Sequence, residues 1–186
     1  PVPLRLLSLG SRLRAPVAAL LAADDTSLLP AGVGWDEILA EALARAVAWL
    51  TDRLGPAMDD WTWASLHRTA PRHTLAGLFP ELADLLNPPA VGAGGDGDTP
   101  QVGAYAGLEG VGFALTNTSV ARYCFDLADW DNSGWVVPLG ASGHPGSPHY
   151  ADQVEAWRDV RLLPMVYRWE RIVREAESRQ TLEPTP

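Results

Sequence analysis

The sequence predicts an α+β fold, with helices first, short antiparallel strands in the second half and a charged helix last. Two observations carry this prediction. Apolar residues recur at helical spacing between positions 36 and 54, whereas short β-branched and aromatic runs follow the Gly- and Pro-rich stretch at 88–97. Because helical and strand patterns are segregated rather than alternating, α+β is favoured over a parallel α/β sheet.

The first 58 residues are expected to be mainly helical. The strongest helix covers residues 36–54, where Asp36 can cap the start and Gly55-Pro56 stops the helix. Residues 4–23 form an earlier helical stretch that Gly10 and Pro16 interrupt.

Residues 59–186 are expected to mix strands, loops and helices. Asn117-Thr118 separates two strand-like runs and suits a tight hairpin turn. Ser147-Pro148 is typical of a helix start, with a cap followed by Pro at the first helical position. The expected elements are a short helix or turn at 59–66, a helical turn at 80–86, strands at 110–116, 119–127, 135–139 and 165–167, and helices at 147–158 and 169–178.

Composition fits one globular domain or a piece of a larger one, since the 186 residues are 47% hydrophobic and 20% charged. The net charge of −9 argues against a nucleic-acid partner, because phosphate binding needs a basic face. No apolar run reaches the roughly 20 residues that span a bilayer. Cys124 is the lone cysteine, so no internal disulfide can form.

Four blocks of distinctive sequence follow one another, and blocks in a fixed order are stronger evidence than any one alone. They are Trp61-Thr62-Trp63-Ala64-Ser65-Leu66-His67 with His73-Thr74-Leu75; Gly94-Gly95-Asp96-Gly97-Asp98-Thr99; Ser119 and Arg122 leading to Asp126-Leu127; and a Gly-rich turn from Gly140 into Ser147-Pro148-His149-Tyr150, Asp152-Gln153 and Trp157. Their order resembles the penicillin acylase (penicillin amidase) family. The chain departs from the family pattern at Ala64, Thr74, Pro100 and Ala141.

The resemblance implies an N-terminal nucleophile hydrolase, in which two antiparallel sheets stack between helical layers (αββα). Such enzymes cleave themselves to expose a Ser that attacks an amide, with its own α-amino group as base and backbone and Asn donors around the oxyanion. No residue here matches that Ser. The chain also begins at Pro1 without Met, so we expect residues 1–186 to be a C-terminal segment of the large (beta) chain.

By the same resemblance, the expected partners are the remainder of the large chain, the small (alpha) chain and a small-molecule amide substrate, with no nucleic acid and no membrane. The substrate would be a β-lactam side chain, an acyl-homoserine lactone or a lipopeptide acyl group. No cofactor is expected in this segment, and a structural calcium would lie elsewhere in the full protein. The expected compartment is periplasmic or extracellular.

Five residues are candidates for the cleft or for a structural loop. Asp96 and Asp98 could line the substrate cleft, although turn Asp residues more often bond nearby backbone amides. Arg122 and Asp126 are expected four apart on one strand, hence on one face. The family resemblance makes Asp126 a catalytic candidate, since in some relatives an acidic residue of this region steadies an active-site histidine. A structural ion pair with a neighbouring strand is the alternative. His149 is expected to hydrogen-bond a carbonyl at a sheet edge.

Other arrangements are weaker. His144, His149 and Asp152 lack the spacing of a metal site, because zinc sites need three convergent ligands. Ser142 has His144 close in sequence but lacks the strand–turn–helix frame of a nucleophile. Residues 129–134 match only part of a calcium-binding loop, because Gly140 stands where the bidentate Glu should be. A polar turn between strands is therefore favoured.

Three further residues have simple interpretations. Cys124 is expected to be a small buried apolar residue, Trp157 a packing residue and Pro1 a boundary rather than a catalytic amine. A different class of function stays open for the whole chain. It could be a stand-alone, non-catalytic binding or structural module derived from the same fold, which would be monomeric and unfold cooperatively.

Overall fold

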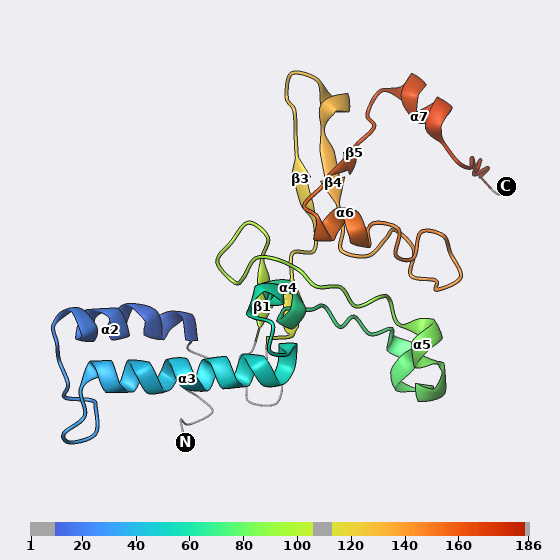
Figure 1. The fold of residues 1–186 in the computed structure, drawn as a ribbon. Helices are drawn as coiled ribbons and strands as arrows, with labels where there is room; N and C mark the ends of the chain where they lie inside the picture. The colour runs from blue at the N-terminus through green and yellow to red at the C-terminus, as the bar shows by residue number, and fades with distance from the viewer. Residues whose placement is uncertain (1–9, 106–112, 185–186) are drawn as a thin grey trace. The chain divides into compact units, whose positions relative to one another are not determined.

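The computed structural model describes residues 10–105 and 113–184. They divide into two compact units that interleave along the chain. The first unit comprises residues 1–70 and 90–117, and the second comprises residues 71–89 and 118–186. Helices come first, short strands follow and a helix comes last, consistent with the α+β prediction (Figure 1).

The first unit is mainly helical and carries a two-stranded sheet, β1-β2. Its elements are α2 (Gly10–Ala22), α3 (Trp35–Leu54), the 3-10 turn η1 (Met58–Asp60), α4 (Trp63–Leu66), β1 (Gly103–Tyr105) and β2 (Leu115–Thr118). α2 continues through Pro16, so the expected interruption there is wrong. The part of the earlier helical stretch before Gly10 lies outside the described residues.

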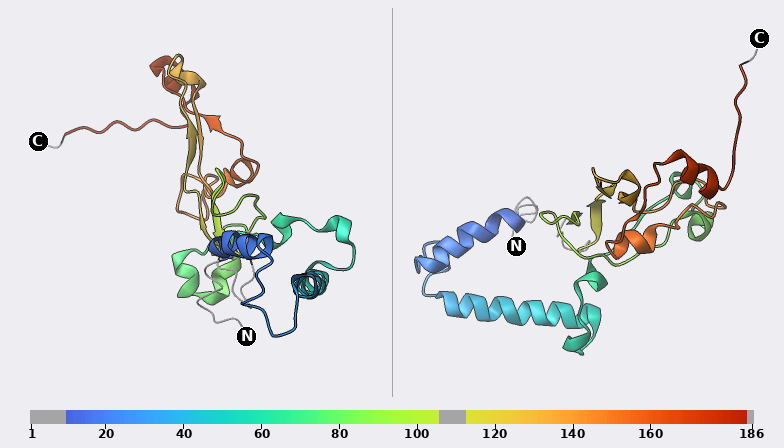
Figure 2. Two further views of the ribbon diagram at one scale, coloured as in Figure 1. Left: turned by 90° about the vertical axis from the view of Figure 1, so that its left-hand side faces the viewer. Right: turned by 90° about the horizontal axis from the view of Figure 1, so that it is seen from above.

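α3 is the long helix that the apolar periodicity predicts, and Figure 2 shows it as one uninterrupted rod. The N-cap residue is Gly34 rather than Asp36. Asp36 lies in the first turn, where its negative charge interacts favourably with the positive end of the helix dipole. The helix ends at Gly55, whose φ of 87° only glycine adopts easily. No residue of α3 is buried.

The second unit is built around an antiparallel sheet of order β3-β4-β5. Its elements are η2 (Thr74–Gly77), η3 (Pro80–Leu82), α5 (Ala83–Leu86), β3 (Arg122–Cys124), η4 (Trp130–Asn132), β4 (Gly134–Val136), α6 (Val154–Arg158), β5 (Leu163–Pro164) and α7 (Trp169–Glu175). Val136 on the central strand is fully buried, and Trp157 of α6 is 1% exposed. These two residues mark the centre of this unit's small core.

The expected hairpin around Asn117-Thr118 is wrong. Both residues lie inside β2, which pairs with β1, while β3 pairs with β4 in a different sheet. Asn-Thr lacks the glycine that a two-residue hairpin turn favours, and β-branched Thr118 suits a strand. Residues 110–112 of the expected strand at 110–116 lie outside the described residues.

The expected helix from Ser147 is also wrong, because α6 begins only at Val154. The Ser147 hydroxyl accepts from the amide of His149 at 3.2 Å instead of capping a helix. Local side-chain bonds of this kind compete with helix formation. The strand expected at 165–167 is wrong, because β5 is Leu163–Pro164 and residues 165–167 belong to no strand. The expected strand at 135–139 and the expected helix at 169–178 are confirmed with shifted ends, as β4 and α7.

Candidate functional site

In the first unit, the structure brings the first two sequence blocks together. α4 places Trp63 and His67 one turn apart, and their rings stack with centroids 4.6 Å apart. The Trp63 indole N–H donates to the Gly95 carbonyl at 2.7 Å. His67 is fully buried, with Nδ1 3.0 Å from the Ala93 oxygen and Nε2 3.0 Å from the Gly103 oxygen. His67 therefore links α4, the Gly-Gly-Asp loop and β1.

Gly92 permits this contact because the backbone passes directly over α4. A Cβ atom at Gly92 would lie 2.3 Å from the Ala64 carbonyl oxygen, far inside van der Waals contact. Gly95 next in the loop has a φ of 75°, which disfavours any side chain. Gly92 is thus required by packing and Gly95 by backbone conformation.

Asp96 and Asp98 close a local turn. The Asp96 carboxylate accepts from the Asp98 amide at 2.9 Å, and the Asp96 amide donates to the Thr99 hydroxyl at 3.1 Å. This arrangement is an Asx-turn, the simpler of the two interpretations that the sequence allows. A role of either carboxylate in a substrate cleft stays a prediction.

Arg122 in the second unit lies across the face of Trp157, with its guanidinium carbon 4.7 Å from the ring centroid. Its Nη1 donates to the Trp157 carbonyl and its Nε to the Ser119 hydroxyl at 3.2 Å. Burial lowers the pKa of Arg122. Its Nη2 is buried without a hydrogen-bond partner among the described residues.

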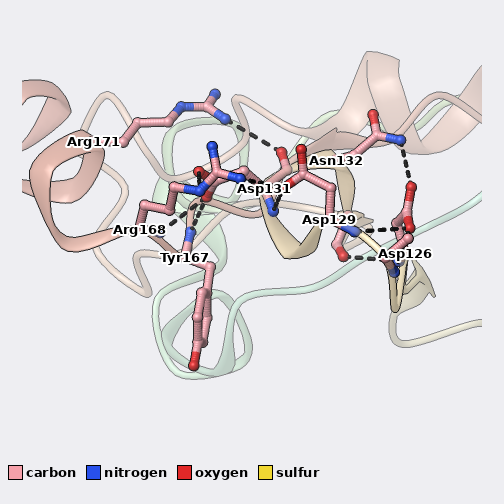
Figure 3. Close-up of polar contacts among 9 residues, drawn as sticks. Asp126, Asp129, Asp131, Asn132, Tyr167, Arg168 and Arg171 are labelled. Atoms are coloured by element: carbon pink, nitrogen blue, oxygen red, sulfur yellow. Dashed lines mark hydrogen bonds and ion pairs between the residues drawn. The ribbon is translucent and has the colours of Figure 1, made fainter.

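Asp126 lies beyond the end of β3, so the expectation that it shares a strand face with Arg122 is wrong. One carboxylate oxygen accepts from the amides of Ala128 and Asp129 at 2.9 and 3.1 Å, and the other accepts from the Asn132 side chain at 2.7 Å (Figure 3). These bonds, that from Asn132 first, lower the pKa of Asp126. The Asp126 carboxylate is therefore hydrogen-bonded to residues of its own turn.

A neighbouring network, which the sequence did not single out, ties the start of α7 to η4 (Figure 3). Asp131 accepts from the amides of Arg168 and Tyr167 at 3.0 and 2.7 Å, and these bonds lower its pKa. Arg168 also pairs with Asp129 at 3.0 Å. The expected polar turn at 129–134 is confirmed. Its hydrogen bonds extend to Arg168, which lies 37 positions after Asp131 in the sequence.

His149 does not bond a carbonyl, and that expectation is wrong. Its Nδ1 lies 2.8 Å from the Asp152 carboxylate and its Nε2 lies 2.8 Å from the Glu177 carboxylate. The bond to Asp152 and then the bond to Glu177 raise the pKa of His149. The imidazole therefore ties the fourth sequence block to the segment after α7.

The rest of the fourth block joins β4 to α6 and α5. The Gln153 side chain accepts from the Val137 amide at 3.1 Å, and the Gln153 amide donates to the Leu139 carbonyl at 2.9 Å. The Tyr150 hydroxyl donates to the Leu86 carbonyl. The fourth block, which is rich in Gly, Pro and Ser, therefore connects the segment after β4 with α5 and α6.

Among the residues that the structure describes, the Ser142 hydroxyl makes no hydrogen bond to a His, Asp or Glu side chain. This hydroxyl accepts from the His144 amide at 3.1 Å, while the His144 ring accepts from the Gly146 amide at 3.0 Å. Within residues 10–105 and 113–184, no three His, Cys, Asp or Glu side chains gather as metal ligands would. Cys124 is exposed, so the expectation of a buried residue is wrong.

The candidate residues are divided between the two units of the chain. Asp96 and Asp98 lie in the first unit, whereas Arg122, Asp126 and His149 lie in the second. Sequence reasoning left out His67 as a candidate, although its i, i+4 spacing from Trp63 indicated a shared helix face. In the part of the chain that the structure describes, no helix has the length and apolar character to cross a membrane.

Comparison with known proteins identifies relatives that are named as acylases. The chain is 46% identical over 168 residues to penicillin acylase 2 proenzyme of Pseudomonas sp. (strain SE83), a match that covers 90% of this chain and 20% of that protein. It is 30% identical over 159 residues to acyl-homoserine lactone acylase QuiP of Pseudomonas aeruginosa, covering 79% of this chain and 18% of that protein.

The chain belongs to the penicillin amidase family, whose sequence model matches residues 8–174. It spans only about one fifth of the length of these two relatives. The family resemblance indicated by the four sequence blocks is thereby confirmed.

Proposed function

We propose that this chain is the C-terminal portion of the large chain of a penicillin acylase-like hydrolase that cleaves linear amide bonds. The segment forms part of the scaffold and cleft wall, and it does not carry the N-terminal Ser nucleophile. In the complete protein it contributes outer strands and helices to an αββα sandwich. The isolated segment is inactive as an amidase.

The small core is the observation that carries this proposal. The buried apolar residues of the described chain are only Ala93, Val136, Val154, Ala156 and Trp157. Large apolar side chains stay exposed instead, among them Leu43, Leu78 and Leu85 at 66%, 70% and 72%. Such exposed apolar side chains support a segment whose apolar surface is covered by further polypeptide.

The proposed reaction of the complete protein is hydrolysis of an amide to a carboxylate and an amine. A Ser from outside this chain attacks the amide carbonyl, and preorganised donors hold the oxyanion. The names of the relatives support a β-lactam side chain or an acyl-homoserine lactone as substrate. A lipopeptide acyl group is a third class that the same chemistry would accept.

The proposed partners are the remainder of the large chain and the small chain. The name proenzyme of one relative supports an enzyme that is processed into chains. Within this segment we propose no cofactor; a structural calcium would be held by residues elsewhere in the full protein. We propose export to the periplasm or outside the cell.

An assay of the complete protein tests the proposal. The polypeptide that contains this segment is incubated with a penicillin, an N-acyl-homoserine lactone and an acylated lipopeptide, and the released amine is quantified. We expect release from at least one substrate, its loss when the N-terminal Ser is replaced by Ala, and full activity in Ser142→Ala. Absence of release from all three, or loss of activity in Ser142→Ala, would contradict the proposal.

A further inference from the structure

The two faces of the β3-β4-β5 sheet differ in how well they are covered. On one face, Val136 is fully buried and α6 contributes Trp157 and Val154, which are 1% and 4% exposed. Arg122, opposite Val136 in the strand register, lies over the Trp157 ring. This face is therefore packed against α6.

The opposite face is aromatic and exposed. Tyr123 and Trp135 are direct register partners on β3 and β4, so their side chains share one face, opposite to that of Arg122 and Val136. The Phe125 ring lies 5.0 Å from the Tyr123 ring and extends the same surface. Tyr123, Phe125 and Trp135 are 63%, 49% and 39% exposed.

We call these three residues the aromatic face. The Tyr123 and Phe125 rings are neighbours, Trp135 is the cross-strand partner of Tyr123, and none of the three side chains is charged. Soluble proteins seldom leave such contiguous apolar surface open unless it contacts another molecule or segment. Aromatic residues gathered in this way are typical of the energetic centre of an interface.

The strand edge beside this face is also open within the second unit. β3 and β5 are the two edge strands of the sheet (Figure 1). β5 carries Pro164, which has no backbone N–H to offer a further strand, whereas β3 contains no proline. The edge next to Tyr123 is therefore the one that can accept another strand.

The matched relatives indicate what covers the face. About four fifths of the penicillin acylase 2 proenzyme lies outside the match, so that relative has further polypeptide that could cover this face. We propose that the aromatic face is the docking surface on which an apolar layer from the remaining acylase polypeptide packs. This inference rests on the proposed function and names the surface through which the segment joins the rest of the enzyme.

Site-specific photo-crosslinking in the complete protein tests this proposal. Tyr123 is replaced by p-benzoylphenylalanine, which keeps an aromatic ring at that position, and the crosslinked peptides are identified by mass spectrometry. Tyr167 is the matched control, since it is 64% exposed and lies in the same unit but off the aromatic face. We expect crosslinks from position 123 to peptides outside residues 1–186 of the same polypeptide, several-fold above the yield from position 167.

Each other outcome would overturn the proposal: crosslinks to a second copy of the segment, crosslinks to residues 1–117, or a yield no higher than that of the control. Amide hydrolysis by the unsubstituted protein is measured in parallel. Hydrolysis without the expected crosslink rejects the docking surface alone, whereas the crosslink without hydrolysis rejects the proposed reaction alone.

Discussion

At the scale of single residues, most candidate polar groups of this chain bond to nearby backbone or to one another. Asp96 and Asp126 accept from amides in their own turns, and the Ser142 hydroxyl accepts from the His144 amide. A side chain committed in this way shapes a loop and has less freedom to take part in proton transfer. The residue-scale predictions therefore concern structure and protonation rather than turnover.

His149 gives the clearest prediction on protonation. Because its folded pKa is raised, its bonds to Asp152 and Glu177 stabilise the fold fully below the unfolded pKa of about 6.5, and this contribution is lost as the pH rises through the folded value. We expect Asp152→Asn to lower the titration midpoint of the His149 ring in an NMR titration. Glu177→Gln should lower it less, because the bond to Asp152 is the larger cause. An unchanged midpoint in both variants would contradict this account.

Asp126 gives the opposite pH dependence. Its pKa is lowered by hydrogen bonds, so its stabilising contribution is present above the unfolded value and is lost as the pH falls through the folded pKa. We expect Asp126→Asn in the complete enzyme to lower the thermal unfolding midpoint at neutral pH and to leave kcat unchanged. A fall in kcat with an unchanged midpoint would instead support the catalytic role.

At the scale of elements, close backbone contacts fix how the sequence blocks meet. The loop at Gly92 passes over α4, and His67 joins that helix to the loop and to β1. The first two blocks are thus one structural piece, whereas the fourth block connects β4 and α6 in the other unit.

Substitution of Gly92 tests this packing directly. In Gly92→Ala the new methyl group would meet the Ala64 carbonyl, so we expect a loss of about 2 kcal/mol in the free energy of unfolding, as overpacking typically costs. Gly97→Ala is the matched control, because no atom lies within 4 Å of its Cβ position. Chemical denaturation of the complete protein measures both. Equal stability of the two variants would refute the contact.

Burial of His67 leads to a second prediction at this scale. We expect His67→Ala to cost about 3 kcal/mol, because it leaves a cavity beneath Trp63 and removes the ring that faces two buried carbonyl groups. Exposed His144→Ala serves as the control and should change stability by less than about 0.5 kcal/mol. A difference within the error of the two denaturation curves would contradict the assigned role.

The sequence predicted the long, periodic helix better than the short strands. α3 follows from nine apolar residues at helical spacing, and its end follows from Gly55. The strands were misjudged because runs of three or four residues give no reliable periodicity, and β2 turned out to pair with β1. Partners of His149 and Asp131 could not be predicted, because Glu177 and Arg168 are distant in sequence.

At the scale of the whole molecule, the few buried apolar residues and the many exposed apolar side chains of the described residues are the features that relate structure to function. A 20-residue amphipathic helix without one buried residue and an aromatic sheet face left open have little reason to occur in a self-contained domain. Both are expected of a segment whose remaining contacts come from further polypeptide. In the two acylase relatives, about four fifths of the protein lies outside the match with this chain.

The most direct test of this claim is sedimentation of purified residues 1–186 combined with thermal unfolding. We predict concentration-dependent self-association and a broad, weakly cooperative transition, because the apolar surface lacks its cover. A monomer at all concentrations with a sharp two-state transition would contradict the account. The chain would then be a stand-alone module of the penicillin amidase family rather than a structural portion of an amidase.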